Sequence, residues 1–214
     1  MKVDTKNLIK SITDSLEELE YIKLDEIPGI DLYMDQVTTL MDKKLRGVTR
    51  YPEVDKILTK TMINNYAKND LLPPPIKKKY SKEHVLVLIF IYYFKSILSI
   101  NDIQTLLQPI TEKYFHNGKD FGMKEIYEEV FRMEPGEIEV LKRDVMEKYE
   151  EAERTFEDLP EEDAEFLRQF SFICLLSYDV YMKKLIIEKM IDDMRPKAVE
   201  KNQKAEKDKK HTEE

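Results

Sequence analysis

Residues 58–107 read LTKTMINNYAKNDLLPPPIKKKYSKEHVLVLIFIYYFKSILSINDIQTLL, and this stretch decides the fold. From Thr59 to about Lys68, apolar residues recur at helical spacing, so we expect a short helix that turns its amides, threonines and lysines outward. The prolines at 73–75 cannot continue a helix, because proline has no amide hydrogen and a fixed backbone angle. We therefore expect the chain to leave extended and to form a short exposed arm, residues 76–80, that carries three lysines.

Two more helices follow the arm. Ser81 is a favourable N-cap, and the helix after it, which runs to about Ile97, is hydrophobic on nearly every side, as expected of a central buried helix. Ser99 and Asp102 form a capping box, in which each side chain accepts a hydrogen bond from a free backbone amide at the start of the next helix. The apolar run is broken by Lys95 and falls short of the roughly 20 residues that span a bilayer, so we expect no membrane segment.

The remainder of the chain also has helical patterns. An amphipathic helix is expected over about residues 5–23 and a second over about 31–45, and beyond residue 120 only helical patterns occur, with a break at Pro135 and Gly136. Past Arg195 apolar residues almost disappear, so we expect a disordered tail. The predicted fold is therefore mainly α. It has four parts: an amphipathic helix (1–29), a basic domain (30–112), an acidic bundle or set of long helices (120–194) and the tail (195–214).

The composition excludes several classes of function. The five glycines never fall in the close clusters that wrap a phosphate, which rules out a P-loop or a Rossmann turn. Cys174 is the single cysteine, so no internal disulfide can form, and the histidines at 84, 116 and 211 do not have the spacing of metal ligands. The acidic amino terminus also lacks the pattern of a signal peptide. We therefore expect a reduced, cytoplasmic protein without a metal or cofactor.

Charge is distributed unevenly along the chain, whose formal net charge is −8. Residues 43–82 hold eleven lysines and arginines against three acids, whereas residues 123–165 hold seventeen acids against six bases. Most charge runs are solvated helix faces, and we adopt that interpretation for the acidic stretch. The basic stretch is different, because its lysines lie in a turn-rich segment beside amides that are suited to reading bases.

The order of elements in the basic stretch resembles the MerR-type winged helix-turn-helix domain. The run Met62-Ile63-Asn64-Asn65-Tyr66, followed by Asp70-Leu71-Leu72, stands where that family has its recognition helix; Lys77-Lys78-Lys79-Tyr80-Ser81 stands at its wing, and Ser99-Ile100-Asn101-Asp102-Ile103 at its next capped helix. Asn64 replaces the family's recognition-helix arginine, and Asp70 replaces a glycine. The run IDLYMDQVTTLMDKKL, residues 30–45, together with LTKTMINNY and LLPPPIKKKYSKEH, also resembles a bacterial family, domain of unknown function 1836.

The MerR-type resemblance implies a transcriptional regulator that binds double-stranded DNA with sequence specificity. The helix from Thr59 to Lys68 would enter the major groove, where Asn64 or Asn65 can pair with adenine. The expected base-reading residues are Thr59, Lys60, Thr61, Asn64, Asn65 and Lys68. The expected phosphate contacts are Lys43, Lys44, Arg46, Arg50, Tyr66, Lys77, Lys78, Lys79 and Tyr80, although packing is the simpler role for Tyr66.

The last expected helix, Glu161 to Met194, carries an apolar seam with the spacing of a helix that docks on another helix. The seam consists of Phe166, Phe170, Ile173, Val180, Ile187, Ile191 and Met194. It either closes a bundle within the chain or forms a dimer contact or a ligand cavity, and both interpretations stay open. For a homodimer, as the resemblance implies, or for a small organic or protein effector, the expected contacts are Phe166, Phe170, Ile173, Tyr178, Tyr181 and Ile187.

Two other classes of function compete with DNA binding. A helical protein–protein interaction module that has lost DNA binding would use the charge gradient to contact another protein. An enzyme is less favoured, because no serine, cysteine or lysine stands in a recognisable nucleophile motif.

Overall fold

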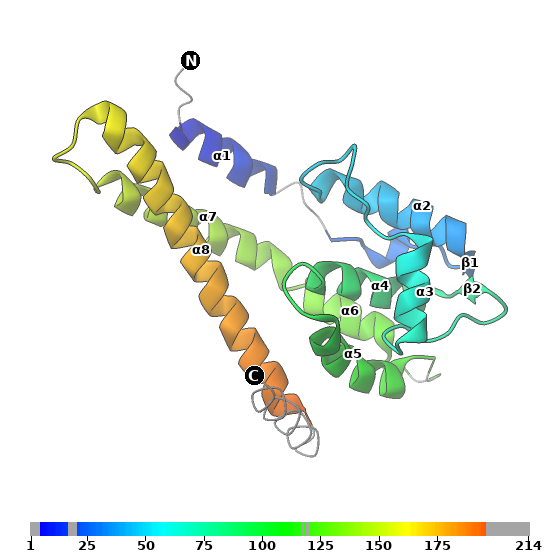
Figure 1. The fold of residues 1–214 in the computed structure, drawn as a ribbon. Helices are drawn as coiled ribbons and strands as arrows, with labels where there is room; N and C mark the ends of the chain where they lie inside the picture. The colour runs from blue at the N-terminus through cyan, green and yellow to red at the C-terminus, as the bar shows by residue number, and fades with distance from the viewer. Residues whose placement is uncertain (1–4, 17–20, 117, 119, 196–214) are drawn as a thin grey trace, which may run out of the picture.

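The protein is mainly helical in the computed structural model, which describes residues 5–16, 21–116, 118 and 120–195 (Figure 1). The α-helices are α1 (Thr5–Leu16), α2 (Met34–Leu45), α3 (Lys60–Lys68), α4 (Lys82–Phe94), α5 (Ile100–Tyr114), α6 (Met123–Phe131), α7 (Glu134–Glu153) and α8 (Glu161–Met194). Two short strands, β1 (Leu32–Tyr33) and β2 (Lys79–Tyr80), and the 3-10 helices Leu24–Glu26 and Arg46–Val48 complete the described elements. The mainly α fold class is thereby confirmed.

Helices α2 to α6 and the two strands form a head around α4 (Figure 1). Every residue from His84 to Ile91 is buried, which agrees with the expected central helix, although α4 ends at Phe94. Its neighbours contribute buried side chains to the same core, namely Val37, Met41, Ile63, Ile103 and Leu107. The same core includes Ile22, Ile27, Met123 and Tyr127, so the head extends beyond the basic domain expected over residues 30–112.

The strands join segments that lie far apart in the sequence. Leu32 pairs with Tyr80, and Tyr33 pairs with Lys79, in an antiparallel register. The Lys79 ammonium lies 5.2 Å from the centroid of the Tyr33 ring, within the range of a cation–π contact. The strand pair therefore ties the start of α2 to the segment that precedes α4.

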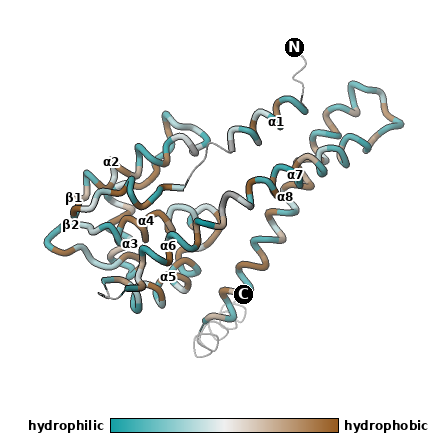
Figure 2. Tube along the Cα trace, turned by 180° about the vertical axis from the view of Figure 1, so that it is seen from behind, coloured by the Kyte–Doolittle hydropathy of each residue, from teal (hydrophilic) through white to brown (hydrophobic). Residues whose placement is uncertain are grey.

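Helices α7 and α8 form an antiparallel hairpin that extends away from the head (Figures 1 and 2). Helix α1 contacts α7, and a second small core joins the three helices through Ile9, Tyr149, Ala152 and Phe172. The described part of α1 therefore braces the hairpin. Residues 17–20, at the end of the first expected helix, lie outside the described residues, as does the tail expected beyond Arg195.

The chain break expected at Pro135 and Gly136 lies slightly earlier in the structure. Helix α6 ends at Phe131, and α7 begins at Glu134. Pro135 therefore lies in the first turn of α7, where its missing amide hydrogen costs no intrahelical bond. In the sequence, a proline that follows the end of one helix looks the same as a proline in the first turn of the next helix. For this reason the expected chain break was placed at Pro135 and not before it.

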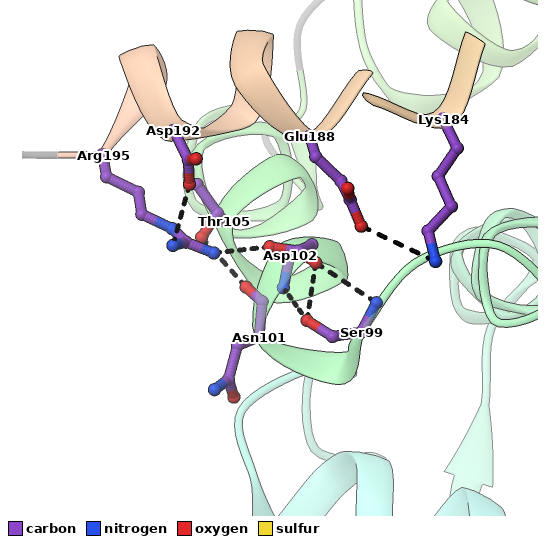
Figure 3. Close-up of polar contacts among 8 residues, drawn as sticks. All are labelled: Ser99, Asn101, Asp102, Thr105, Lys184, Glu188, Asp192 and Arg195. Atoms are coloured by element: carbon purple, nitrogen blue, oxygen red, sulfur yellow. Dashed lines mark hydrogen bonds and ion pairs between the residues drawn. The ribbon is translucent and has the colours of Figure 1, made fainter. Parts of the chain in front are cut away.

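The last turns of α8 return to the head and pack against α5 (Figure 3). Ile191 is buried in the head core, and Arg195 forms an ion pair with Asp102 at the start of α5 that is 2.5 Å long. Asp102 also completes the predicted capping box: it accepts from the Ser99 amide at 3.2 Å, and its own amide donates to the Ser99 hydroxyl at 3.2 Å. The predicted box is thus confirmed, and the same carboxylate anchors α8.

Candidate nucleic-acid interface

Helix α3 presents a polar face to solvent. Thr59 caps the helix, because its hydroxyl accepts a hydrogen bond from the Met62 amide at 3.2 Å. Ile63 and Tyr66 are buried in the head core, which fixes the rotation of the helix. The exposed residues are Lys60, Thr61, Asn64, Asn65 and Lys68. Five of the six expected base-reading residues therefore share one exposed face, and Thr59 serves mainly as the cap.

A tight turn at Lys77 and Lys78 replaces the extended arm expected from the sequence. The Ile76 amide donates to the Lys79 carbonyl at 3.1 Å, and the Lys79 amide donates to the Ile76 carbonyl at 2.9 Å. Both turn residues have positive φ, 50° for Lys77 and 64° for Lys78, as in a type I′ turn. Such turns favour Asn-Gly, because most other side chains are strained in the left-handed region. Two exposed lysines are thus held at the tip of a strained turn.

Because of this strain, we expect the protein to become more stable when Lys77 and Lys78 are replaced by two residues that favour a type I′ turn. We expect the double variant Lys77→Asn/Lys78→Gly to raise the free energy of unfolding by about 1–2 kcal/mol, because it relieves left-handed strain. Urea denaturation measures the change. The control is Lys77→Gln/Lys78→Gln, which removes the same charges and keeps the strain. Equal stability of the two double variants would show that the turn stores no strain.

The remaining basic residues differ in their partners. Two of them form ion pairs with carboxylates: Lys44 with Glu26, and Arg46 with Asp42. The phosphate contacts expected of Lys44 and Arg46 would therefore have to replace these pairs. Lys43 and Arg50 are exposed and remain better placed for the expected contacts.

The two tyrosines expected to contact phosphate are buried. Tyr66 is 7% exposed and Tyr80 is 2% exposed, and burial raises the pKa of both hydroxyls. Packing is therefore the role of Tyr66, as the sequence favoured. The expected phosphate contact of Tyr80 is corrected, because its pairing with Leu32 turns its side chain into the head core.

A family model matches this part of the chain. The family is described as domain of unknown function (DUF1836), and the match covers residues 22–130, slightly more than half of the chain. The chain belongs to this family. No curated protein and no solved structure matches the chain. The match confirms the resemblance drawn from residues 30–45, 58–66 and 71–84, and the DUF1836 region coincides with the head.

The DUF1836 region departs from a simple helix-turn-helix in the connection between α2 and α3. A helix-turn-helix uses a turn of about three or four residues, whereas this connection runs from Arg46 to Thr59. It borders a cavity of about 460 Å³ lined by Thr49, Asp55, Lys56, Ile57, Tyr92, Tyr93, Lys95 and Ser96. Lys95 donates to the Ile57 carbonyl at 2.6 Å, and burial lowers the pKa of its ammonium. Lys95 thus anchors the connection to the end of α4.

A buried histidine lies at the base of the turn at Lys77 and Lys78, which we call the lysine turn. The sequence did not predict a structural role for this residue. His84 is 1% exposed; its Nδ1 accepts from the Ser81 amide at 2.9 Å, and its Nε2 lies 3.4 Å from the Pro74 carbonyl oxygen. Burial lowers the pKa of His84 to about 4. Because it contacts the chain before and after the turn, His84 fixes the turn on α4. Its position three residues after an N-cap serine was the available signal.

Ser81, Glu83 and the exposed His116 extend this cluster. The Ser81 hydroxyl lies 2.8 Å from His84 Nδ1 and 3.1 Å from His116 Nε2, and His116 Nδ1 lies 3.2 Å from a Glu83 carboxylate oxygen. A serine, a histidine and a carboxylate are the components of a nucleophilic triad. Here the serine hydroxyl is shared between two imidazoles at the start of a helix, so we interpret the cluster as a structural cap.

The contacts expected of α8 divide into two groups. Phe166, Phe170, Ile173, Tyr178 and Tyr181 are each more than half exposed. Ile187 is partly buried against the head core, and its role as a dimer or effector contact stays a prediction. Within the described residues, no cluster of three or more His, Cys, Asp or Glu side chains could hold a metal ion, and no helix is both long and apolar enough to cross a membrane.

Proposed function

We propose that the protein is a transcriptional regulator of MerR-like type that binds double-stranded DNA with sequence specificity. Helix α3 enters the major groove, and the turn at Lys77 and Lys78 contacts the phosphate backbone beside it. The α3 helix and the strand pair lie on the side of the head away from the α7–α8 hairpin (Figures 1 and 2). Both elements therefore lie clear of the acidic hairpin.

The lysine turn is the observation that carries the proposal. Backbone strain of about 1–3 kcal/mol per residue persists where the surrounding structure imposes it, and it concentrates at functional sites. Lys77 and Lys78 carry this strain although they are exposed and contribute nothing to the core. A pair of cations held rigidly outside the fold loses little conformational entropy when it binds an anion. The phosphates of DNA are such anions.

The exposed amides of α3 supply the means of reading sequence. Within the described part of the chain, the side-chain amides of Asn64 and Asn65 make no hydrogen bond to the protein. An asparagine amide pairs with both the N6 and N7 positions of adenine in the major groove. Lys60 and Lys68, at the two ends of the same face, would contact flanking phosphates or guanine.

The acidic hairpin is the part of the protein that we place away from DNA. The hairpin, residues 134–194, holds eighteen acids against eight bases, so it repels phosphates. We propose that this part handles association and any small organic or protein effector. The last residues of α8 contact α5, and the Gln104 side chain of α5 donates to the carbonyl of Asn69, the C-cap of α3, at 3.2 Å. These contacts connect the hairpin to α3.

The amide face makes a direct prediction about specificity. We expect Asn64→Ala and Asn65→Ala each to lower the preference for fragments selected from genomic DNA, relative to mixed DNA, by about 1–3 kcal/mol. Affinity for mixed DNA should change little, because the cations remain. Competition binding assays measure both quantities. Asn101→Ala, at an exposed position at the start of α5, is the matched control, and unchanged preference in both α3 variants would remove α3 as the reading helix.

A protein–protein interaction module is the second candidate function. The exposed apolar residues of α8 favour it, because apolar stripes on a surface mark contacts with other proteins. The two functions separate in one experiment on the wild-type protein. Binding of genomic fragments that weakens steeply with salt supports the regulator. Absence of binding at low salt, together with co-purification of another protein, supports the interaction module.

A further inference from the structure

The connection between α2 and α3 forms a cavity with the end of α4. The cavity has a volume of about 460 Å³, within the range of about 300–1,000 Å³ that is typical of small-molecule sites. The connection contributes Asp55, Lys56 and Ile57 to its lining, and the end of α4 contributes Tyr92, Tyr93 and Lys95. Lys56 and Tyr93 are exposed, so a solute can reach the cavity from solvent. The chemistry of these side chains decides which solute the cavity can hold.

Two tyrosine rings give the cavity an aromatic lining. The centroids of the Tyr92 and Tyr93 rings lie 5.7 Å apart, and the rings are inclined at 76° to each other. Tyr92 also packs against the head core, which holds its ring in place. Aromatic rings prefer offset-stacked or edge-to-face contacts, so two rings nearly at right angles can contact the face and the edge of a third. This part of the cavity favours a ligand with a flat aromatic ring.

Lys95 supplies a cation that forms no ion pair with any carboxylate of the described residues. Its ammonium donates to the Ile57 carbonyl at 2.6 Å and lies 4.7 Å from the centroid of the Tyr92 ring. An ammonium has three hydrogens to donate, so these two contacts leave one for a ligand. Burial lowers the pKa of this ammonium, as expected where no carboxylate offsets its desolvation. A ligand carboxylate would supply the missing charge.

Most other polar groups of the lining are already used within the chain. The hydroxyls of Thr49 and Ser96 each donate to a backbone carbonyl at 2.8 Å. The Asp55 carboxylate accepts from a backbone amide of the connection at 2.9 Å. Lys56, in contrast, is exposed and forms no ion pair within the described part of the chain. Two lysines against one acid give the lining a positive balance of charge, which favours an anion.

We propose that this cavity binds a small aromatic carboxylate. The ring of the ligand packs against Tyr92 and Tyr93, and its carboxylate accepts a hydrogen bond from the Lys95 ammonium. The site belongs to the head, whereas the proposed function assigns any effector to the α7–α8 hairpin. Binding requires only the connection and the end of α4, so this inference stands whether or not the protein binds DNA.

The first test is a titration of the full chain without DNA, followed by the backbone amide signals in two-dimensional NMR spectra. The probes are benzoate and phenylacetate. We expect saturable shifts at the amides of Lys56, Tyr93 and Ser96, and about ten-fold weaker binding of neutral benzamide, which has the ring without the charge. Acetate, which has the charge without the ring, should also bind more weakly. Absence of saturable shifts at the cavity, or equal binding of benzoate and benzamide, overturns the proposal.

The second test separates the two parts of the site with variants. Lys95→Met should lose the preference for benzoate over benzamide. Tyr93→Ala should weaken the binding of benzoate by about five-fold, because one aromatic contact is lost. The matched control is Tyr51→Ala, since Tyr51 is an exposed tyrosine of the same connection that does not line the cavity.

The outcome that contradicts the proposal is the same for both variants. It is an unchanged preference in Lys95→Met, or an affinity of Tyr93→Ala equal to that of Tyr51→Ala. Because Lys95 also holds the Ile57 carbonyl, circular dichroism checks that Lys95→Met keeps its helix content. If that variant does not fold, Tyr93→Ala decides alone. Neither test contains DNA, so its result is separate from the test of DNA binding.

Discussion

The double variant Lys77→Glu/Lys78→Glu is expected to lose binding to mixed genomic DNA, with an affinity lower by on the order of 100-fold or more. Each substitution removes a cation from the exposed turn and adds an anion that repels the same phosphate. Both side chains are exposed, so the head core is not altered. Fluorescence anisotropy against mixed fragments, from about 50 mM to about 200 mM salt, measures the effect.

The salt dependence gives a second, independent readout of the same variant. If each lysine neutralises one phosphate, the slope of log affinity against log salt should become smaller by about 2. The matched control is Lys10→Glu/Lys124→Glu, which changes two exposed lysines outside the basic stretch by the same charge. If both double variants bind like wild type, or both weaken binding equally, the lysine turn is not the phosphate contact.

Stability is expected to fall as the pH is lowered from about 6.5 to about 4, because of His84. Its pKa is about 4 in the folded protein and 6.5 in an unfolded chain. In this window the unfolded chain takes up a proton that the buried ring does not accept, so protonation favours unfolding. Below the folded pKa both states are protonated, and the loss is complete. The expected loss is about 3 kcal/mol over the window, measured by urea denaturation at each pH.

Replacement of the ring isolates this contribution. His84→Gln keeps hydrogen-bonding groups beside Ser81 and Pro74 but does not titrate, so its stability should depend much less on pH in this window. His116→Gln, which replaces the exposed neighbouring imidazole, should keep the wild-type pH dependence. A pH dependence in His84→Gln as steep as in wild type would show that carboxylates, and not His84, cause the acid sensitivity.

The helices of the head could be predicted from the sequence because their signals are local. The Ser99 and Asp102 box needs only a serine and an acid three residues apart, and the structure contains it. The outward face of α3 follows from the burial of Ile63 and Tyr66 at helical spacing. These signals involve neighbours within one or two turns, so no knowledge of the remaining chain is needed.

The geometry of the candidate site depended on contacts between distant segments. Two consecutive lysines carry no turn signal. Their left-handed conformation accompanies the two hydrogen bonds between Ile76 and Lys79, and the pairing of β2 with β1 holds the end of this turn on the head. The same pairing buries Tyr80, whose hydroxyl had been expected at the surface. The ion pair of Lys44 with Glu26 likewise joins residues from different elements. Charge and composition could not distinguish an available cation from a paired one.

The amino-acid sequence by itself determined that the chain is mainly helical, that α3 has a polar outer face, and that α8 carries an apolar seam, because each property is a periodic pattern along one element. Only the tertiary structure decided how these surfaces are used. The seam is covered at Ile191 by the head and open at Ile173, since coverage depends on where α5 and α7 lie. A helical pattern fixes which side chains share a face, whereas the packing of distant elements decides which faces remain exposed.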